Sequence, residues 1–220
     1  DDGDAIVSVQ FCGEDDDVLL AASGGKCIRF PVIDVRVFKS RDSVGVRGIR
    51  LVGGDELIAM SILGHVETDS DTRESYLRWS NARRRAEGDG EADGDPLPMP
   101  PQAEAMAQSE QFILSITQNG YGKRTSAYEY RVTGRGGQGI INIETSDRNG
   151  PVVASAPVGE DHHIMLVTDT GRLIRIPVHD IRIAGRNTQG VTLFDVEPNE
   201  RVVSVAWLSE QASGDGNGDS

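Results

Sequence analysis

Arginine recurs at three fixed places in a stretch of sequence that is written three times in this chain. One place lies four residues after a turn glycine, the next lies seven residues further on, and the last opens an R-x-x-x-G element. In chain order the three columns are Arg29, Arg124 and Arg175; Arg36, Arg131 and Arg182; and Arg41, Arg135 and Arg186. A guanidinium is a planar, permanently charged donor that suits phosphate recognition. The columns therefore predict either a surface that contacts many phosphates or a set of ties between the repeats.

The neighbours of each column favour one of these two roles. An acid stands two positions before each arginine of the second column, which favours ion pairs that hold the repeats together. No acid recurs beside the R-x-x-x-G column, and its glycine lets backbone N–H groups approach a ligand closely. We therefore expect phosphate contacts there. For the first column, whose basic neighbours are Lys26, Lys123 and Arg172, both roles stay open.

The repeated stretch itself predicts the fold class. The copies run over 17–51, 110–143 and 162–193, and each contains short β-rich runs separated by glycine turns. A repeat cannot bury its apolar face alone, so the copies must stack on one another. Four short strands per unit indicate an all-β array of propeller-like blades. Strands are expected at 18–22, 27–30, 48–51 and 56–62 and at the matching places of the later copies, while 5–9 reads as the last strand of an upstream copy in what looks like a fragment.

An insertion separates the first copy from the second. The arginine of the R-x-x-x-G element recurs after 94 residues and then after 51, and the excess falls on 66–110. We predict one helix there, roughly over 71–86 with Ser70 or Asp71 as its N-cap, followed by a disordered linker. We expect Tyr76, Leu77 and Trp79 to pack onto the neighbouring blade, although docking of a partner is the alternative. The predicted divisions are 1–16 for the end of an upstream blade, 17–65, 111–157 and 158–208 for three blades, 66–110 for the insertion, and 209–220 for a disordered acidic tail.

The net charge of −13 is distributed unevenly. Residues 1–17 hold seven acidic and no basic side chains, and the insertion holds eleven acidic and five basic ones. The blade segments 18–65 and 111–208 together carry seventeen basic and fourteen acidic side chains. A polyanion could therefore bind the repeats although the whole chain is acidic.

The sequence lacks the residue patterns of several kinds of functional site. Cys12 and Cys27 do not have the spacing of a metal site, and a reduced cytoplasmic protein is the simplest interpretation. No apolar run approaches the roughly 20 residues that span a bilayer. The glycine runs lack the lysine of a phosphate-binding loop, and the four histidines suggest no catalytic triad. We expect no catalytic residue, no metal and no cofactor in this segment.

Several motifs resemble the C-terminal region of the DNA gyrase A subunit. They are GVRGIRL at 45–51, TQNGYGKRT at 117–125 and GRNTQGV at 185–191, in matching register. The resemblance implies a six-bladed β-pinwheel, of which these copies would be the last three, with a basic rim that bends double-stranded DNA. The seven-residue box QRRGGKG of the family is not found, and GRGGQG at 134–139 is its nearest string. No tyrosine here matches the family's DNA-cleaving context, and the insertion is not part of the common pattern.

The resemblance also implies a function and partners. The segment would wrap DNA for ATP-dependent negative supercoiling by a bacterial, cytoplasmic, nucleoid-associated type II topoisomerase, in an A2B2 complex with the gyrase B subunit. ATP and Mg²⁺ would be used elsewhere in that holoenzyme. The alternatives are the equivalent domain of topoisomerase IV and a non-catalytic propeller that binds protein. The candidate DNA contacts are Arg41, Arg47, Arg135, Arg186, Lys26, Arg29, Lys123, Arg124, Arg172 and Arg175.

Overall fold

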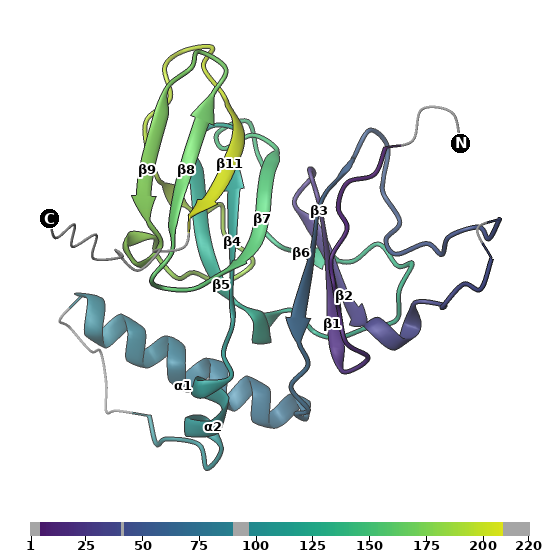
Figure 1. Ribbon diagram of the computed structural model, residues 1–220. Coiled ribbons are helices and arrows are strands. Elements are labelled where there is room, and N and C mark those ends of the chain that lie inside the picture. The colour runs from purple at the N-terminus through teal and green to yellow at the C-terminus, as the bar shows by residue number, and fades with distance from the viewer. Residues whose placement is uncertain (1–4, 41, 90–96, 209–220) are drawn as a thin grey trace, which may run out of the picture.

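The computed structural model describes residues 5–40, 42–89 and 97–208, which form three antiparallel sheets and a pair of helices (Figure 1). The first sheet has the order β3 (Leu57–Gly64), β1 (Asp16–Ala22), β2 (Lys26–Pro31), β6 (Ile140–Ile141). The second has the order β10 (Val191–Thr192), β5 (Tyr121–Ser126), β4 (Phe112–Thr117), β7 (Val152–Val158). The third has the order β11 (Val202–Leu208), β8 (His163–Thr168), β9 (Leu173–Pro177). The predicted all-β class is confirmed.

Each copy begins with the predicted hairpin. The turn glycines Gly25, Gly120 and Gly171 have φ values of 85°, 78° and 86°, a region that side-chain-bearing residues rarely adopt. Each hairpin is followed by one 3-10 turn: η1 (Val32–Asp34), η2 (Ala127–Glu129) and η3 (Val178–Asp180). The hairpin and its 3-10 turn are thus the constant part of the repeat.

Each of the first two sheets receives one strand from the following copy, an arrangement that we call the strand exchange. The short strand after the second R-x-x-x-G element, β6, pairs with β2 of the first copy, with Cys27 opposite Ile140. In the same way β10 of the third copy pairs with β5 of the second, with Gly122 opposite Val191. The sequence-based assumption that the four strands of one copy form one sheet is therefore corrected: each copy completes the sheet of the copy before it.

Two predicted strands, over 48–51 and 5–9, are absent from the described residues. The counterparts of 48–51 in the later copies are β6 and β10, which form only because a preceding sheet supplies an edge. A strand needs a partner for its backbone N–H and C=O groups. Within the described residues no preceding sheet stands beside 48–51, and no first strand of the same copy stands beside 5–9, so neither segment forms a ladder.

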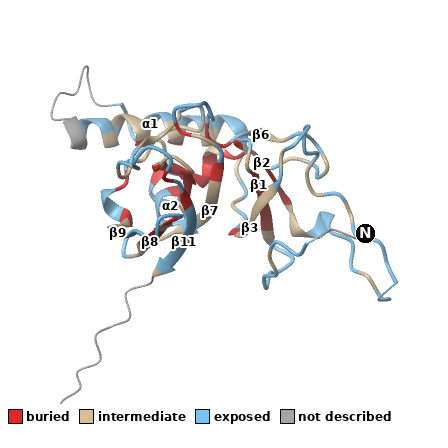
Figure 2. Ribbon diagram, turned by 90° about the horizontal axis from the view of Figure 1, so that it is seen from above, coloured by how far each residue is buried: buried red, intermediate tan, exposed pale blue. Residues whose placement is uncertain are grey.

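The hydrophobic core lies between the sheets as well as within each one. Leu19, Cys27 and Leu63 of the first copy pack with Ile113 and Tyr130 of the second. The second and third copies share a like cluster of Leu114, Ile116, Ile164, Leu166, Val178, Ile181 and Val202. Neighbouring sheets approach along β3, β7 and β11. The most buried strands are β1 and β2 of the first sheet and β4 and β5 of the second, and Figure 2 shows red on β1 and β2.

The insertion folds into α1 (Ser70–Asp89) and α2 (Ala103–Gln108), which pack below the second sheet (Figure 1). The N-cap is Asp69, whose carboxylate accepts from the Thr72 backbone N at 2.8 Å and from its hydroxyl at 2.9 Å. The predicted caps, Ser70 and Asp71, are corrected by this geometry. The second helix lies where only a linker was expected, and residues 90–96 of that linker fall outside the described residues.

Tyr76 anchors the insertion to the second copy. Its side chain is buried with Met106 and with Tyr128, whose ring it meets edge-on at 5.4 Å between centroids. The Tyr76 hydroxyl donates to Glu110 at 2.8 Å. Leu77 and Trp79 are partly buried against the same cluster. The aromatic residues of the insertion therefore pack onto the neighbouring blade, as expected.

Candidate nucleic-acid interface

Arg29, of the first arginine column, ties the first copy to the second. Its side chain is only 6% exposed and pairs with the fully buried Asp17 at 2.7 Å. Its Nη1 donates to the carbonyl oxygen of Ala127 at 2.9 Å, and Nη2 donates to that of Gly64 at 3.1 Å. The guanidinium is consumed by these contacts and is not available to a ligand.

Arg124 repeats this arrangement one copy later. Its side chain donates from Nε to the Ile181 carbonyl at 2.7 Å and from Nη2 to the His179 carbonyl at 3.1 Å. Glu160 supplies the acid, at 3.2 Å. Arg175, at the same position of β9, is exposed and has no side-chain partner among the described residues. The first column is therefore a structural tie wherever a following copy is present.

The glycine of the R-x-x-x-G element serves the strand exchange. Gly139 and Gly190 have φ values of 72° and 79°. A Cβ on Gly190 would lie 2.7 Å from the Gly122 carbonyl oxygen, and one on Gly139 would collide with that of Cys27. The glycine lets one backbone approach the strand of the preceding copy. The expected approach to a ligand is thus replaced by an approach to protein.

The arginines of this element lie beside that junction. Arg135 is exposed and donates to the carbonyl oxygens of Asp34 at 2.9 Å and Arg47 at 3.2 Å. Arg186 is half-buried and donates from Nη1 to the Ile141 carbonyl at 2.6 Å. Arg41 lies outside the described residues. Arg135 and Arg186 therefore use part of their donor capacity on the preceding copy.

Two arginine-bearing loops are hydrogen-bonded side by side at the first junction. The backbone N of Gly136 donates to Gly48 O at 2.5 Å, and that of Arg50 donates to Gly137 O at 2.8 Å. Loop 45–50 carries Arg47 and Arg50, both exposed, and loop 134–139 carries Arg135. Three arginines from two copies are thereby carried on adjoining loops. Arg50, which sequence reasoning missed, is found from this pairing and not from any column.

Lys123 holds the corresponding loop of the third copy from beneath. Its side chain is buried, and Nζ donates to the carbonyl oxygens of Gly185 at 2.6 Å, Arg186 at 2.7 Å and Thr188 at 3.1 Å. Burial lowers the pKa of Lys123 to about 8. This lysine positions loop 185–190 and is itself covered by it.

The second arginine column is exposed. Arg131 and Arg182 have no side-chain partner among the described residues, and Arg36 lies over the Phe38 ring at 5.4 Å. The expected pairs with Asp34, Glu129 and Asp180 do not form. Glu129 instead accepts from the Arg186 backbone N at 2.8 Å, and Asp180 lies 3.4 Å from His179. The ties that the sequence pattern favoured for the second column are therefore absent, and Arg29 and Arg124 of the first column, whose role was left open, form ties instead.

The remaining candidates differ in their surroundings. Arg172 pairs with Glu200 at 2.6 Å. The buried Glu200 carboxylate accepts from the Glu197 N at 2.9 Å and from the hydroxyls of Thr168 and Thr170, which hold its pKa at about 2. Lys26 lines an open cavity of about 780 Å³ together with Arg50 and Arg201. That cavity lies where the turns of the first and second copies meet.

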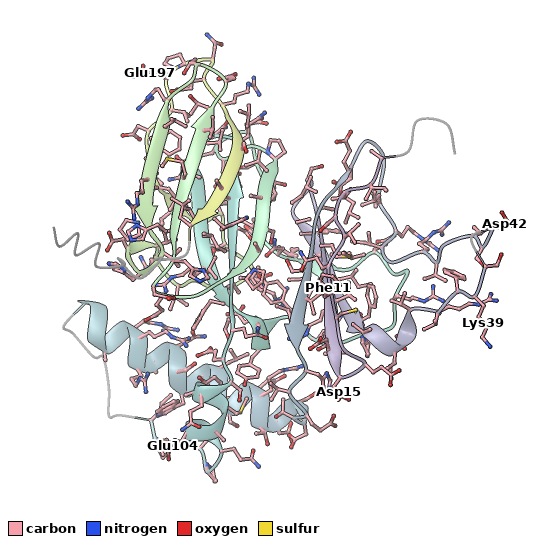
Figure 3. The ribbon with its side chains drawn as sticks, viewed as in Figure 1. Phe11, Asp15, Lys39, Asp42, Glu104 and Glu197 are labelled. Carbon is pink, nitrogen blue, oxygen red and sulfur yellow. The ribbon has the colours of Figure 1, made fainter. Side chains whose placement is uncertain are left out.

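Other side chains mark the extremities of the molecule. Lys39 and Asp42 point away from the sheets at the outer end of the loop after η1, and Glu197 lies at the far tip of the third copy (Figure 3).

Burial raises the pKa of the Cys27 thiol to about 12, which makes it inert near neutral pH. No group of three or more His, Cys, Asp or Glu that could hold a metal ion occurs within 5–40, 42–89 and 97–208. Neither helix in that part of the chain is long and apolar enough to cross a membrane.

The repeats match a known family model three times. Residues 16–63, 111–158 and 162–206 each fit the model described as the DNA gyrase C-terminal domain, beta-propeller. Curated proteins that bear the name of the DNA gyrase A subunit are similar to this chain. The one from Granulibacter bethesdensis is 46% identical over 100% of this chain and 25% of its own length. The one from Rickettsia bellii is 45% identical over 96% of this chain and 24% of its own length.

Solved structures share the fold. A structure of the DNA gyrase A C-terminal domain superposes with a TM-score of 0.62 at 20% identity, covering 89% of this chain and 51% of that one. A crystal structure of the C-terminal domain of DNA topoisomerase IV gives a TM-score of 0.62 at 20% identity, covering 89% and 47%. The chain spans about a quarter of the length of the curated relatives named above. Because the family model matches all three copies, and with them more than half of the residues, the protein belongs to the DNA gyrase C-terminal domain family of beta-propellers.

Proposed function

We propose that this chain is the DNA-binding and DNA-wrapping module of a DNA gyrase A subunit. The observation that carries the proposal is the pairing of loops 45–50 and 134–139, which gathers Arg47, Arg50 and Arg135 where two copies join. Loop 185–190 takes the same place on the second sheet through β10. Each junction thus presents a cationic loop at a regular interval.

A series of such loops is the layout that wrapping requires. DNA resists smooth bending, at a cost of roughly 1–6 kcal/mol for a short site, so the cost has to be offset by many phosphate contacts spread over a curved surface. Contacts of this kind neutralise phosphates without reading bases. The second column adds one exposed cation per copy: Arg36, Arg131 and Arg182.

The proposal extends to the whole protein. This segment would support ATP-dependent negative supercoiling by a type II topoisomerase, in an A2B2 complex with gyrase B, in the bacterial cytoplasm at the nucleoid. ATP and Mg²⁺ would be used elsewhere in the holoenzyme, with no cofactor and no catalytic residue in this segment. Because the ends of the chain are acidic and repel DNA, DNA binding would depend on the cationic loops between the copies.

The test is a titration of DNA binding against salt with the full-length protein that carries this segment. The logarithm of affinity falls with the logarithm of salt concentration by about 0.9 per neutralised phosphate. Replacing Arg47, Arg50 and Arg135 by glutamine should make this slope shallower by about 2 to 3 on unrelated DNA sequences. The control is Arg73→Gln/Arg78→Gln, which removes two positive charges from the inserted helix. An unchanged slope in the triple variant would favour the alternative of a propeller that binds protein.

A second measurement separates gyrase from topoisomerase IV. The full-length protein with its ATPase partner should convert relaxed plasmid to negatively supercoiled plasmid when ATP is added. Relaxation or decatenation alone would assign the segment to topoisomerase IV. The gyrase assignment is favoured by the curated relatives, which bear that name at 46% and 45% identity.

A further inference from the structure

A groove runs between the inserted helix and the third copy. The C-terminal half of α1 passes below η3 in Figure 1, and a cavity of about 950 Å³ lies between them. Asn81, Arg84 and Arg85 line it from α1. The segment 179–191 lines it from the other side, and Arg124 lies between the two walls. The insertion and a blade two sheets later in the chain thus share one surface.

The helix wall of this groove is fixed in place. Arg84 pairs with the buried Glu110, which also accepts from the anchoring Tyr76. Arg84 and Arg124 lie over the same ring, that of Phe112, at 5.1 and 5.9 Å from its centroid. These contacts join α1 to the first strand of the second sheet. The position of the next residue, Arg85, is therefore set by the fold.

The groove carries an excess of positive charge. Arg85 on α1 and Arg182 on the opposite wall are exposed, and neither has a side-chain partner among the described residues. Arg84 and Arg124 are paired with Glu110 and Glu160. The one acid that lines the groove within the described part of the chain is Asp180, and it lies beside His179 at 3.4 Å. Two unpaired guanidiniums in a groove that a single acid lines are suited to an extended polyanion.

The groove is continuous with a loop of the candidate interface. Gly185, Thr188 and Gly190, which belong to the loop held by Lys123, form part of its lining. A duplex whose backbone contacts this loop therefore meets the C-terminal half of α1 next. Acidic segments of the chain itself are the rival occupants, but nothing in the described structure brings one to the groove.

We propose that this groove binds the phosphodiester backbone of DNA through Arg85 and Arg182, which makes the 66–110 insertion part of the DNA-contacting surface. This inference rests on the proposed DNA-wrapping function and assigns it one more contact site. The insertion then extends the path of the duplex beyond the cationic loops of the candidate interface. Arg182 would belong to the phosphate-contacting set together with Arg131.

The test uses the full-length protein, the variant Arg85→Ala/Arg182→Ala, and a random-sequence duplex as the probe. The slope of log affinity against log salt should become shallower by about 1 to 2, and affinity at about 0.1 M salt should fall roughly tenfold. Arg73→Ala/Arg78→Ala, on α1 outside the groove, removes the same charge and should leave the slope as it is. Circular dichroism and melting curves verify that both variants fold.

Each outcome bears on the proposal. Arg85→Lys/Arg182→Lys should keep the slope, because a phosphate contact accepts either cation; a loss equal to that of the alanine variant would show a structural role and overturn the inference. An unchanged or higher affinity in the alanine variant, as expected if an acidic segment filled the groove, would also overturn it. If the variant at Arg47, Arg50 and Arg135 makes the slope shallower while the groove variant does not, the groove proposal is wrong and the wrapping function stands. If neither variant makes the slope shallower, both proposals are wrong.

Discussion

The guanidinium of Arg29 donates a hydrogen bond to the carbonyl oxygen of Ala127, which lies 98 residues further along the chain. The same side chain pairs with Asp17 in its own sheet, so a single buried cation holds two successive copies at a fixed angle. Arg124 joins the second copy to the third through Ile181 and Glu160, both of which belong to the third copy. The geometry of the array is thus set by charged ties as well as by the apolar faces.

Arg29→Ala should loosen the first junction. The change leaves the carboxylate of Asp17 buried without its main partner, and breaking such a pair costs on the order of 3–5 kcal/mol. Amide hydrogen exchange should become faster by at least about two orders of magnitude in β2 and η2. Arg175→Ala is the control, since the same position of β9 is exposed and has no side-chain partner among the described residues. Equal exchange in the two variants would show that the tie contributes nothing.

Gly139→Ala should destabilise the strand exchange. The new side chain would have to adopt φ near 72° and would collide with the Cys27 carbonyl. Together these effects are expected to cost at least about 2 kcal/mol, which lowers the midpoint of thermal unfolding by roughly 4 °C or more. Gly134→Ala, five residues earlier, places its Cβ where no atom lies within 4 Å and should melt like the parent protein. Calorimetry on the pair checks the prediction, and coincident melting curves would contradict it.

Lys123 should give stability an alkaline pH dependence. Its pKa in the folded protein is about 8, below the ordinary 10.5, so between these values the unfolded chain binds a proton that the folded protein does not. Stability therefore rises with pH across this window, with a limiting slope of about 1.4 kcal/mol per pH unit. Lys123→Met should lose this rise, which denaturant unfolding from pH 7 to 10.5 would measure. Parallel pH profiles for the two proteins would rule the effect out.

Glu200 should give stability an acidic pH dependence of the opposite form. Its pKa is about 2 in the folded protein and 4.5 ordinarily, so the stabilisation is complete above pH 4.5 and is lost as pH falls toward 2. Glu200→Gln should be less stable at neutral pH and should show a smaller loss between pH 5 and 3. Glu197→Gln is the control, because only the backbone of that residue bonds to Glu200. Identical acid unfolding of the parent and Glu200→Gln would refute the assignment.

The sequence predicted the features that depend on near neighbours. The hairpins follow from alternating apolar residues and a turn glycine, and the structure places β1, β2, β4, β5, β8 and β9 close to the predicted runs. The exchange of β6 and β10 could not be predicted in the same way. An edge strand offers its hydrogen bonds equally to its own copy and to the next one, and no local residue pattern decides between them.

The roles of the arginine columns were harder to assign because their partners do not repeat. Arg29 takes its acid from the start of β1 and Arg124 takes its acid from the segment before β8, so no alignment of the copies shows a common partner. One signal was present nevertheless. Arg29 lies two residues after the core residue Cys27 on the same strand, which places both on one face of the sheet. Lys123 likewise occupies a position that is Ile28 and Ile174 in the other copies.

The exchanged strands also set the order in which the chain can finish folding during its synthesis. A ribosome delivers β1, β2 and β3 well before β6, with the entire insertion in between. The first sheet must therefore wait with one edge open until the second copy has emerged, and the second must wait for the third. Helices α1 and α2 leave the ribosome during the first of these waits. Each sheet is thus completed only when the following copy has been synthesised. In a stalled or truncated chain, the most recently synthesised sheet lacks the strand that the next copy would supply.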